Sequence, residues 1–414
     1  MVRKKIEDLG KVISGGTPST KNERYWGGDI AWITPKDLSK HDSMFIFKGE
    51  RGITEEGLKN SSAYTVPTGT VLFSSRAPIG YVAIAGKNLT TNQGFKNIVV
   101  NDENDNLFIY YLLKNNIKFI ESHANGSTFK EISAKVFKNL EFDVPNLDTQ
   151  RKISKILSTL DSKIELNNQI ISNLEELAST LFKRWFVDFE FPDENGKPYK
   201  SSGGKMVDSE LGEIPEGWKV TNLEEISIDI ITGKTPNTKQ KENYGEDIPF
   251  IKIPDMHNNT YIVQTETYLS KKGSDSQYKK LLPKDSICVS CIATPGLVSI
   301  TSVASHTNQQ INTILPKVED LYFLYLDLKR KKNLIRELGS GGSTTLNLNK
   351  TQFGKINIVN CGKREKMNFN KICEPLFSKI LLLQKSNIYL AKLRDLLLPK
   401  LLSGEIELPE DEEM

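Results

Sequence analysis

The chain is poor in the features that mark secreted, membrane-spanning or disulfide-stabilised proteins. Its 414 residues include four cysteines and four histidines, and no run of 18 apolar residues occurs. The basic start at residues 1–6 is not followed by an apolar segment, so the sequence predicts neither a membrane-spanning helix nor a signal peptide. Hydrophobic residues form 38% and charged residues 26% of the chain, which is ordinary for a soluble globular protein.

Motifs of the common catalytic classes are also absent from the sequence. There is no G-x-S-x-G elbow, no G-x-G-x-x-G after a strand and no H-E-x-x-H. The Asp/Asn-Pro-Pro-aromatic motif of enzymes that methylate amino groups and a PD…(D/E)xK nuclease core are missing too. Gly233-Lys234-Thr235 resembles the end of a phosphate-binding loop, but Ile228 occupies the position of the leading glycine. The sequence therefore places no active site on this chain.

What the sequence does contain is a long internal repeat. Residues 9–182 recur as residues 223–398; the matched pairs up to Asp37/Asp255 are 218 positions apart, and those after a two-residue deletion are 216 apart. Solenoid repeats have periods of roughly 20–50 residues, so this one is expected to be two copies of a whole module. The matched pairs include Thr17/Thr235, Thr20/Thr238, Lys21/Lys239, Gly27/Gly245, Asp29/Asp247, Asp37/Asp255, Gly80/Gly296, Asn92/Asn308 and Phe137/Phe353.

The repeat helps to interpret the four cysteines. All four lie in the second copy, so the shared fold cannot depend on disulfides, and a reducing, cytoplasmic location is predicted. Cys288 and Cys291 have the spacing of zinc ligands, but no second pair follows and His306 is the only histidine nearby. Because Cys288 replaces Leu72 of the first copy, we expect buried free cysteines and no metal site.

The net charge of +3 is distributed unevenly. Residues 405–413 contain six acidic side chains and no basic one, so the preceding 404 residues carry a charge of +9. A basic body permits contact with nucleic acid through release of phosphate counterions. Solvated surface lysines would give the same charge, so charge alone does not decide between the two interpretations.

Short strand-like runs separated by glycine and proline open each copy. We predict strands at residues 30–33, 70–73, 81–84 and 97–100, and at residues 248–251, 286–289, 297–300 and 312–315. One helix follows in each copy (residues 107–120 and 321–338), and then a further strand (residues 140–144 and 356–359). Each module is therefore expected to be α+β with a mixed or antiparallel sheet.

A long helix with a heptad pattern closes each copy. Apolar side chains recur at alternating spacings of four and three, which is typical of a coiled coil. Asp148 or Thr149 is expected to cap the first helix, Pro192 with Asn195-Gly196 to end its region in a turn, and Pro399 to bend or break the second helix. The seam positions are Ile153, Leu157, Leu160, Ile164, Asn167, Ile171, Leu174, Ala178, Leu181 and Trp185, and Leu376, Ile380, Leu383, Asn387, Leu390, Arg394, Leu397 and Leu401.

The two helices are expected to pair as an intramolecular, antiparallel coiled coil; the alternative is that each helix packs on its own module as ordinary core. Each seam contains one asparagine, Asn167 and Asn387, and a buried asparagine fixes the register when it meets another. Matching these two makes partner numbers sum to 554, which pairs apolar positions throughout, such as Trp185 with Phe369. Only Leu160 then meets a charge, Arg394, whose head is expected to reach water.

Four polar loop clusters are the candidates for ligand contact. Hydroxyl, amide and basic groups on glycine-containing loops suit phosphates and base edges, although the same residues also turn and cap chains. The candidates for contact with DNA are Thr17, Lys21, Arg24, Ser74, Ser75, Arg76, Thr91, Asn92, Gln93, Lys130, Lys239, Ser290, Asn308, Gln309, Ser343 and Thr344.

Several of these segments together resemble a known family. They are WGGDIAWITPKD at residues 26–37, TNQ at 91–93, the Gly-Ser-Thr loop at 126–128, LFKRWFVDF at 181–189, EIPEGW at 213–218 and LPKLLSGEI at 398–406. Over essentially the whole chain they resemble the DNA-specificity subunit of type I restriction-modification systems. The second copy departs from the opening motif, with YGEDIPFI at 244–251, as expected if the two domains read different half-sites.

The resemblance implies an α+β chain with two repeated target-recognition domains separated by an antiparallel coiled coil of two long helices. The domains are expected at residues 1–147 and 218–365, the helices at 148–190 and 366–404, a linker at 191–217 and an acidic tail at 405–414. Such a chain reads a bipartite target in double-stranded DNA and is itself non-catalytic. It docks two modification subunits, which methylate adenine with S-adenosylmethionine, and restriction subunits, which use ATP and Mg. No cofactor is expected on this chain.

Three alternatives stay open at this point: a specificity module of another restriction-modification type, an enzyme with an unrecognised active site, and a protein-interaction scaffold that does not bind DNA. Within the favoured interpretation, positions where the copies agree should support the scaffold or the DNA backbone. Positions where they differ on the same loop should choose bases. Arg76 corresponds to Ile292 of the other copy. Arginine pairs bidentately with guanine, although a surface salt bridge would also explain an arginine at this position.

Overall fold

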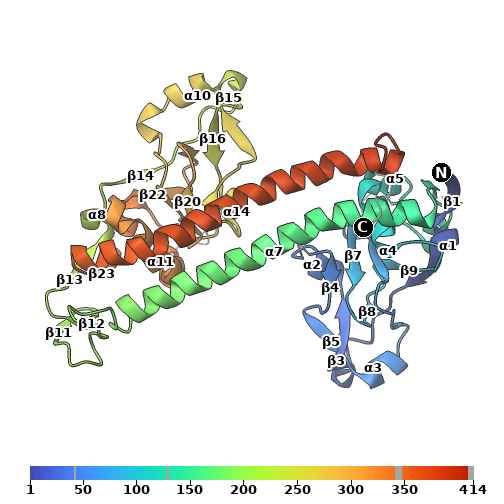
Figure 1. Cartoon of the computed structure of the whole chain (residues 1–414), viewed down its shortest axis with the longest axis horizontal. Coiled ribbons are helices and arrows are strands. Elements are labelled where there is room, and N and C mark those ends of the chain that lie inside the picture. Colours follow the sequence, from blue (N-terminus) through green and yellow to red (C-terminus); the bar gives the residue numbers. More distant parts are fainter. Residues whose placement is uncertain (42, 127–129, 341–346, 409–414) are drawn as a thin grey trace, which may run out of the picture. The chain divides into compact units, whose positions relative to one another are not determined.

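A computed structural model of the chain describes residues 1–41, 43–126, 130–340 and 347–408. It divides into two compact units, Met1–Glu165 with Ile388–Met414, and Leu166–Asn387. Two long helices, α7 (Leu147–Phe186) and α14 (Lys363–Ser403), each contribute residues to both units (Figure 1). Each unit thus combines one copy of the repeated module with parts of both helices, and the units are described separately below.

Unit 1 contains a five-stranded sheet in the order β2-β9-β6-β7-β4 and a three-stranded sheet in the order β5-β3-β8. Most pairs are antiparallel, but β4 with β7 and β3 with β8 are parallel, which confirms the predicted mixed sheet. Its elements before α7 are β1 (Val2–Lys5), α1 (Ile6–Leu9), β2 (Gly10–Ser14), η1 (Glu23–Tyr25), β3 (Trp26–Ile33), α2 (Pro35–Leu38), β4 (Phe45–Ile46), β5 (Arg51–Ile53), α3 (Glu55–Lys59), β6 (Val71–Ser75), β7 (Ile79–Ala85), β8 (Thr90–Thr91), β9 (Phe95–Val100), α4 (Asn106–Asn115), α5 (Ile117–Ser122), α6 (Ala134–Lys138) and β10 (Glu141–Val144).

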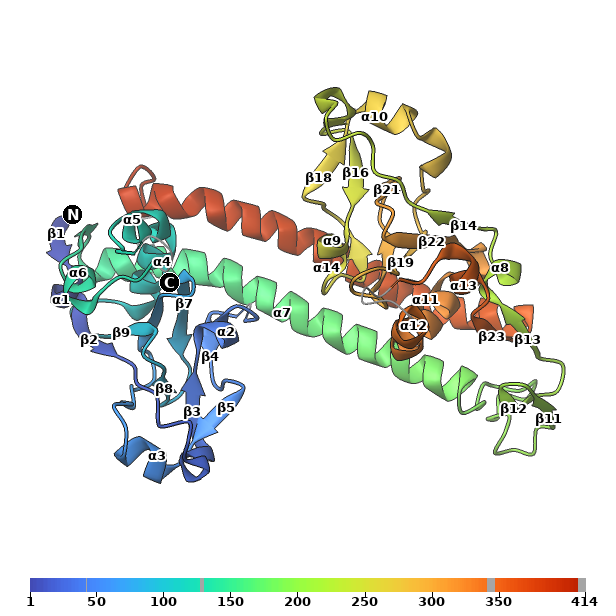
Figure 2. The same ribbon diagram turned by 180° about the vertical axis from the view of Figure 1, so that it is seen from behind.

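Unit 2 reproduces this topology, with a five-stranded sheet in the order β14-β22-β19-β20-β17 and a smaller sheet in the order β15-β18-β16-β21, marked by β16 and β18 in Figure 2. Its elements between the long helices are β11 (Met206–Ser209), β12 (Gly212–Pro215), β13 (Lys219–Asn222), α8 (Leu223–Ile226), β14 (Asp229–Thr232), η2 (Lys241–Asn243), β15 (Tyr244–Gly245), β16 (Ile248–Ile251), α9 (Ile253–Met256), β17 (Tyr261–Ile262), β18 (Thr267–Leu269), α10 (Lys271–Asp275), η3 (Tyr278–Lys280), β19 (Ile287–Ser290), β20 (Val298–Thr301), β21 (His306–Thr307), β22 (Ile311–Leu315), η4 (Val318–Asp320), α11 (Leu321–Arg330), α12 (Lys332–Gly339), α13 (Lys350–Gly354) and β23 (Asn357–Asn360). The repeat in the sequence is therefore a repeat of the fold.

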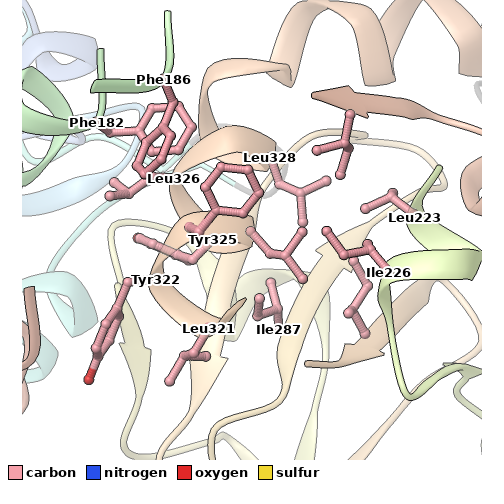
Figure 3. Packing of buried hydrophobic residues seen from close by; sticks show 14 of the residues in the cluster. Phe182, Phe186, Leu223, Ile226, Ile287, Leu321, Tyr322, Tyr325, Leu326 and Leu328 are labelled. Atoms are coloured by element: carbon pink, nitrogen blue, oxygen red, sulfur yellow. The ribbon is translucent and has the colours of Figure 1, made fainter. Parts of the chain in front are cut away.

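The long helices supply core side chains to the modules. In unit 2, Phe182 and Phe186 of α7 pack with Tyr325 and Leu326 of α11 in a cluster that also includes Ile287 of β19 (Figure 3). In unit 1 the corresponding cluster takes side chains from both long helices as well. Burial of each large apolar side chain stabilises by roughly 1.5–3 kcal/mol, so the helices and modules stabilise one another. Ile153 and Leu157 of α7, and Phe369 and Phe377 of α14, do lie in the core of their own modules, as the alternative expects, but the helices also pair with each other.

The predicted register of the coiled coil is confirmed. Asn167 donates from Nδ2 to Oδ1 of Asn387 at 2.7 Å, and the Trp185 and Phe369 rings lie 5.8 Å apart between centroids, both within unit 2. Because the partner number falls as the residue number rises, the helices are antiparallel. One expectation is wrong: the head of Arg394 does not extend freely into water. Its side chain is 16% exposed in unit 1, and its guanidinium lies 2.5 Å from Oδ1 of Asp161 and 2.7 Å from Oδ1 of Asp395.

Three local predictions about helix boundaries are also wrong. The first long helix is capped by Asn146, whose Oδ1 accepts a hydrogen bond from the Thr149 amide at 2.9 Å, and not by Asp148 or Thr149. The second is not broken at Pro399 but continues to Ser403, because burial of the flanking leucines in unit 1 outweighs the single missing donor. The helix predicted at residues 107–120 is two helices, α4 and α5, and that at 321–338 is α11 and α12.

These two helix breaks have a local cause. The backbone of Asn116 leaves the helical region at φ −109° and ψ 18°, and its Nδ2 donates to the Leu112 carbonyl at 2.8 Å. At the matching place in unit 2, Lys331 has φ −79° and ψ 12° and its Nζ lies 2.5 Å from Oδ2 of Asp327. A side chain that satisfies the last turn of a helix stabilises its end.

The segment predicted as a linker is ordered. Residues 191–217 include the antiparallel hairpin of β11 and β12, and Gly196 adopts φ +77° at the expected turn. Phe191, Ile214 and Trp218 are buried in the core cluster of unit 2. The segment that joins the two repeats is therefore part of unit 2.

Candidate nucleic-acid interface

In each unit, two polar loops and one strand end meet at the same place. In unit 1 the amide of Gly16 donates to the Thr91 carbonyl and the amide of Asn92 donates to the Ile33 carbonyl, both at 2.9 Å. The Thr17 hydroxyl donates to the side-chain carbonyl of Gln93. Unit 2 repeats all three contacts, from Lys234 to Thr307 at 3.0 Å, from Asn308 to Ile251 at 3.1 Å and from Thr235 to Gln309 at 2.5 Å.

Glycine is required where these loops touch. A Cβ on Gly15 would lie 2.0 Å from the Asn92 carbonyl oxygen, and one on Gly233 would lie 2.2 Å from that of Asn308. Any larger residue would separate the two loops, because backbone cannot yield at these distances. The shared Gly-x-Thr and Thr-Asn-Gln motifs thus build one polar edge in each unit.

Side chains that could reach a ligand surround this edge in unit 1. Lys21, Arg24 and Gln93 are exposed and Thr17 is half-buried. The guanidinium of Arg51, a residue that the sequence did not single out, lies 3.6 Å over the centre of the Trp26 ring. Stacking of this kind orients an arginine while leaving its N–H donors free to bind phosphate or bases.

Around the equivalent edge of unit 2, Lys239 and Gln309 are exposed and Asn308 is half-buried. Both asparagines of the Thr-Asn-Gln loops serve the turn itself: Oδ1 of Asn92 accepts from the Gly94 amide at 2.9 Å, and Oδ1 of Asn308 from the Gln310 amide at 3.1 Å. These two matched residues therefore have the scaffold role that agreement between the copies predicts.

Four of the candidate residues are buried and their hydroxyl groups are used by the fold. Ser74, Ser75, Thr91 and Ser290 are each fully buried. Ser74 donates to the Pro78 carbonyl and Ser290 to the Thr294 carbonyl, at 2.8 and 2.6 Å, so the two copies share this loop closure. Ser75 donates to the Gly94 carbonyl at 3.1 Å, and Thr91 accepts from Asn97 at 2.8 Å. We therefore remove these four from the proposed contact surface.

Arg76 remains on that surface. Its Nη1 lies 3.4 Å from Oε2 of Glu131, and the two side chains are 36% and 40% exposed. Such a pair contributes at most about 1 kcal/mol, so a ligand can compete for the guanidinium. Lys96, buried behind it, lies 3.9 Å from Oε1 of the same carboxylate. Burial lowers the pKa of Lys96, Glu131 opposes this, and Arg76 adds to it.

The two copies differ in charge at this loop while sharing its backbone. The backbones of Arg76 and Glu131 form an isolated antiparallel β-bridge in unit 1, and those of Ile292 and Asn347 form the same bridge at the matching positions of unit 2. Lys96 is replaced by Asn312. Of the other candidates, Lys130 is exposed with Nζ 3.3 Å from Oε1 of Glu121, while Ser343 and Thr344 lie outside the described residues.

Within the described residues, no group of three or more histidine, cysteine or acidic side chains is placed to hold a metal ion. Cys288 and Cys291 are buried, and burial raises their pKa values to about 12 and about 11, so both remain protonated thiols rather than metal-binding thiolates. His306 is buried against the Ser274 hydroxyl, 2.8 Å from its Nε2, and burial lowers its pKa. No helix in the described ranges is both long and apolar enough to cross a membrane.

Comparison with known proteins agrees with this architecture. The family model of the type I restriction modification DNA specificity domain matches residues 1–176 and 215–360. The chain is 36% identical to the MjaIX specificity subunit of Methanocaldococcus jannaschii, over 98% of this chain and 94% of that protein. It is 40% identical to the HindI specificity subunit of Haemophilus influenzae, over 72% of this chain and 77% of that protein.

A solved structure shares the fold. The crystal structure of the type I restriction-modification S subunit from M. genitalium superposes with a TM-score of 0.60 at 18% identity, covering 99% of this chain and 96% of that one. The family match covers most of the sequence, with one matched segment in each copy of the repeat. The chain therefore belongs to the family of DNA-specificity subunits of type I restriction-modification systems.

Proposed function

We propose that this chain is a non-catalytic subunit that reads a bipartite sequence in double-stranded DNA, one half-site with each unit. The observation that carries the proposal is the pair of matching polar edges, built on the same backbone contacts but bearing different side chains. Shared contacts position a protein on the phosphate backbone, whereas side chains that differ select bases. Arg76 in unit 1 against Ile292 in unit 2 is the clearest such difference.

We further propose that catalysis belongs to partners: two modification subunits that transfer a methyl group from S-adenosylmethionine to adenine, and restriction subunits that consume ATP with Mg. The helix α14 offers a docking surface for them. Tyr389, Leu393 and Leu396, all in unit 1, are 71%, 44% and 60% exposed at spacings of four and three. Apolar side chains in register on an exposed helix face mark a partner surface. We refer to these three residues as the outer stripe.

The proposed location is the cytoplasm, where such a complex meets DNA. The most direct biochemical test of the proposed DNA-binding function is to combine the chain with its modification subunits and measure binding to DNA over a range of salt concentrations. Release of counterions predicts an affinity that falls steeply as salt rises. Absence of salt-sensitive binding would favour a protein-interaction scaffold. Methyl transfer by the isolated chain would favour an enzyme, and the neighbouring genes would reveal another restriction-modification type.

Arg76→Ala is predicted to weaken or alter recognition of the first half-site only. Loss of a bidentate contact to guanine lowers discrimination by about 1–3 kcal/mol, or roughly 5- to 150-fold, at one base position. The measurement is the methylated motif left by the assembled complex on random-sequence DNA. Arg3→Ala is the matched control, because Arg3 is also an exposed arginine in ion pairs, with Glu141 and Asp143. An unchanged motif methylated at the normal rate would exclude Arg76 from base reading.

The spacing between half-sites is predicted to depend on the long helices. About 35 residues at ~1.5 Å each give roughly 50 Å, or about 15 base pairs of ~3.4 Å, and we expect half-site centres on the order of 10 base pairs apart. Inserting one heptad into each helix adds about 10 Å and should lengthen the spacer by about three base pairs, with both half-sites unchanged. A spacer of unaltered length would contradict this dependence.

A further inference from the structure

The seam between the long helices carries a buried polar cluster in unit 1. Asp161 of α7 accepts from Nη1 of Arg394 on α14 at 2.5 Å and from the Tyr111 hydroxyl on α4 at 2.6 Å. The Asp161 and Arg394 side chains are only 15% and 16% exposed. Arg394 also donates from Nε and Nη2 to Oδ1 of Asp395, at 2.9 and 2.7 Å, so Asp161 is the charge that depends more on this pair. Burial and the Asp161 carboxylate both raise the pKa of Tyr111, which therefore stays a hydrogen-bond donor.

The corresponding place in unit 2 has no charge. Helices α4 (Asn106–Asn115) and α11 (Leu321–Arg330) match at an offset of 215, which gives Leu326 for Tyr111. The offset of 216 gives Phe377 for Asp161 and Ala178 for Arg394. All three belong to the buried apolar cluster of unit 2. The two units share a fold, but the seam carries a buried ion pair at this position in unit 1 and buried apolar side chains at the matching position in unit 2.

The asparagine pair is asymmetric in the same way. Asn167 of the first copy corresponds to Leu383 of the second, and Asn387 corresponds to Ile171. In the folded chain the two asparagines meet each other, and Asn387 donates also to Oδ1 of Asn168 at 2.7 Å. Each copy therefore carries one seam asparagine, and its polar partner is present only on the seam of the other copy.

Pairing of like halves would break both matches. Two first halves in the same antiparallel register would place Asp161 of each against Ala178 of the other first half, and Asn167 of each against Ile171 of the other. Two second halves would place Arg394 against Phe377 and Leu326, and Asn387 against Leu383. Arg394 would also have to enter a space that alanine fills. A buried charge without its partner weakens association by roughly 100-fold or more.

We propose that the α7 seam is a docking surface selective for an α14-type seam, so that a first half associates with a second half and rejects another first half. The repeat alone would make the two halves interchangeable partners, because their apolar seam positions match. The pairs Asp161–Arg394 and Asn167–Asn387 remove that ambiguity. Pairing two first halves leaves the Asp161 carboxylate without its cation, and either like pairing leaves the seam asparagines against apolar side chains. The partner recognised is a helix with arginine and asparagine seven residues apart on its seam, as Arg394 and Asn387 are.

The test uses the full chain with a protease site inserted between Ser202 and Gly203, which are both exposed. The folded chain is cut there, unfolded in urea and refolded by dilution, and native mass spectrometry counts the fragment pairs. We expect at least about 95% of pairs to contain one first and one second half. Homodimers near the random share of about half, or fragments that do not reassemble while the uncut chain refolds, would overturn the proposal.

Two sets of variants separate selectivity from simple loss of stability. Copying the residues of the other repeat, with Asp161→Phe, Asn167→Leu, Asn387→Ile and Arg394→Ala, should raise the homodimer share toward random. Exchanging the charges, with Asp161→Arg and Arg394→Asp, keeps a complementary pair and should preserve first–second pairing even if the first set folds poorly. The matched control is Lys163→Ala with Lys392→Ala, at exposed positions of the same helices. A homodimer share that is equal in all variants would overturn the proposal.

Discussion

Replacing Arg394 with alanine is expected to lower the free energy of unfolding of unit 1 by about 3 kcal/mol, because it strands a buried charge. Asp161 is only 15% exposed, and without the guanidinium it keeps just the Tyr111 hydroxyl as a donor. Solvent screens the pair weakly at this burial, so the loss should far exceed that of a surface ion pair. The lost guanidinium stem adds a packing term in the same direction.

The measurement should report on unit 1 alone. Trp26 and Trp32 lie in unit 1 whereas Trp185 and Trp218 lie in unit 2, so fluorine NMR of fluorotryptophan-labelled chain separates their urea transitions. The control Lys392→Ala, at an exposed position two residues away, should leave the midpoint unchanged. Replacing both Asp161 and Arg394 with leucine should recover most of the loss, since apolar packing can replace a buried ion pair. A loss below about 0.5 kcal/mol for Arg394→Ala would show that the pair is solvated.

The second large effect is expected at the outer stripe. Changing Leu393 and Leu396 together to glutamate should weaken binding of the modification subunit by at least about 100-fold. Burying each of the two leucines contributes about 1.5 kcal/mol, and the added charges must be desolvated as well. Both side chains are largely exposed in the chain alone, at 44% and 60%, so its own fold should not change.

Isothermal titration of the modification subunit into the chain measures this effect. The control is Lys392→Glu alone, which changes the net charge by −2, as the two leucine changes do, at an exposed position of the same helix outside the stripe. The circular dichroism spectrum and urea midpoint of each variant should match those of the unchanged chain. If the modification subunit binds the stripe and control variants with equal affinity, the docking surface lies elsewhere on the chain.

The seam and its register could be predicted from the sequence because they depend on periodicity alone. Heptad spacing decides which side chains face the partner helix, and two seam asparagines leave one antiparallel alignment that matches them. The repeated strands followed from the same kind of pattern. The ion pair of Arg394 could not be predicted in this way. Its partner Asp161 lies one residue from the predicted seam position Leu160, and their contact is apparent only once the helices are packed.

Predictions about single polar residues succeeded less often. Ser74, Ser290 and Thr91 belong to motifs that recur in both copies, and the structure shows that they recur because they close loops inside the fold. A serine that donates to a buried carbonyl and one that contacts a phosphate leave the same signature in a sequence. Likewise, the helix break at Asn116 depends on a side-chain contact to the preceding turn, which periodicity cannot reveal.

Mapping methylated adenines in the DNA of a host that carries this system tests the central claim most directly. Two units with different reading surfaces predict a motif of two unlike half-sites separated by a run of unspecified bases. Exchanging residues 1–145 for those of a relative should replace one half-site and leave the other half-site and the spacer unchanged. A continuous motif, or a change in both half-sites after this exchange, would contradict the assignment of one half-site to each unit.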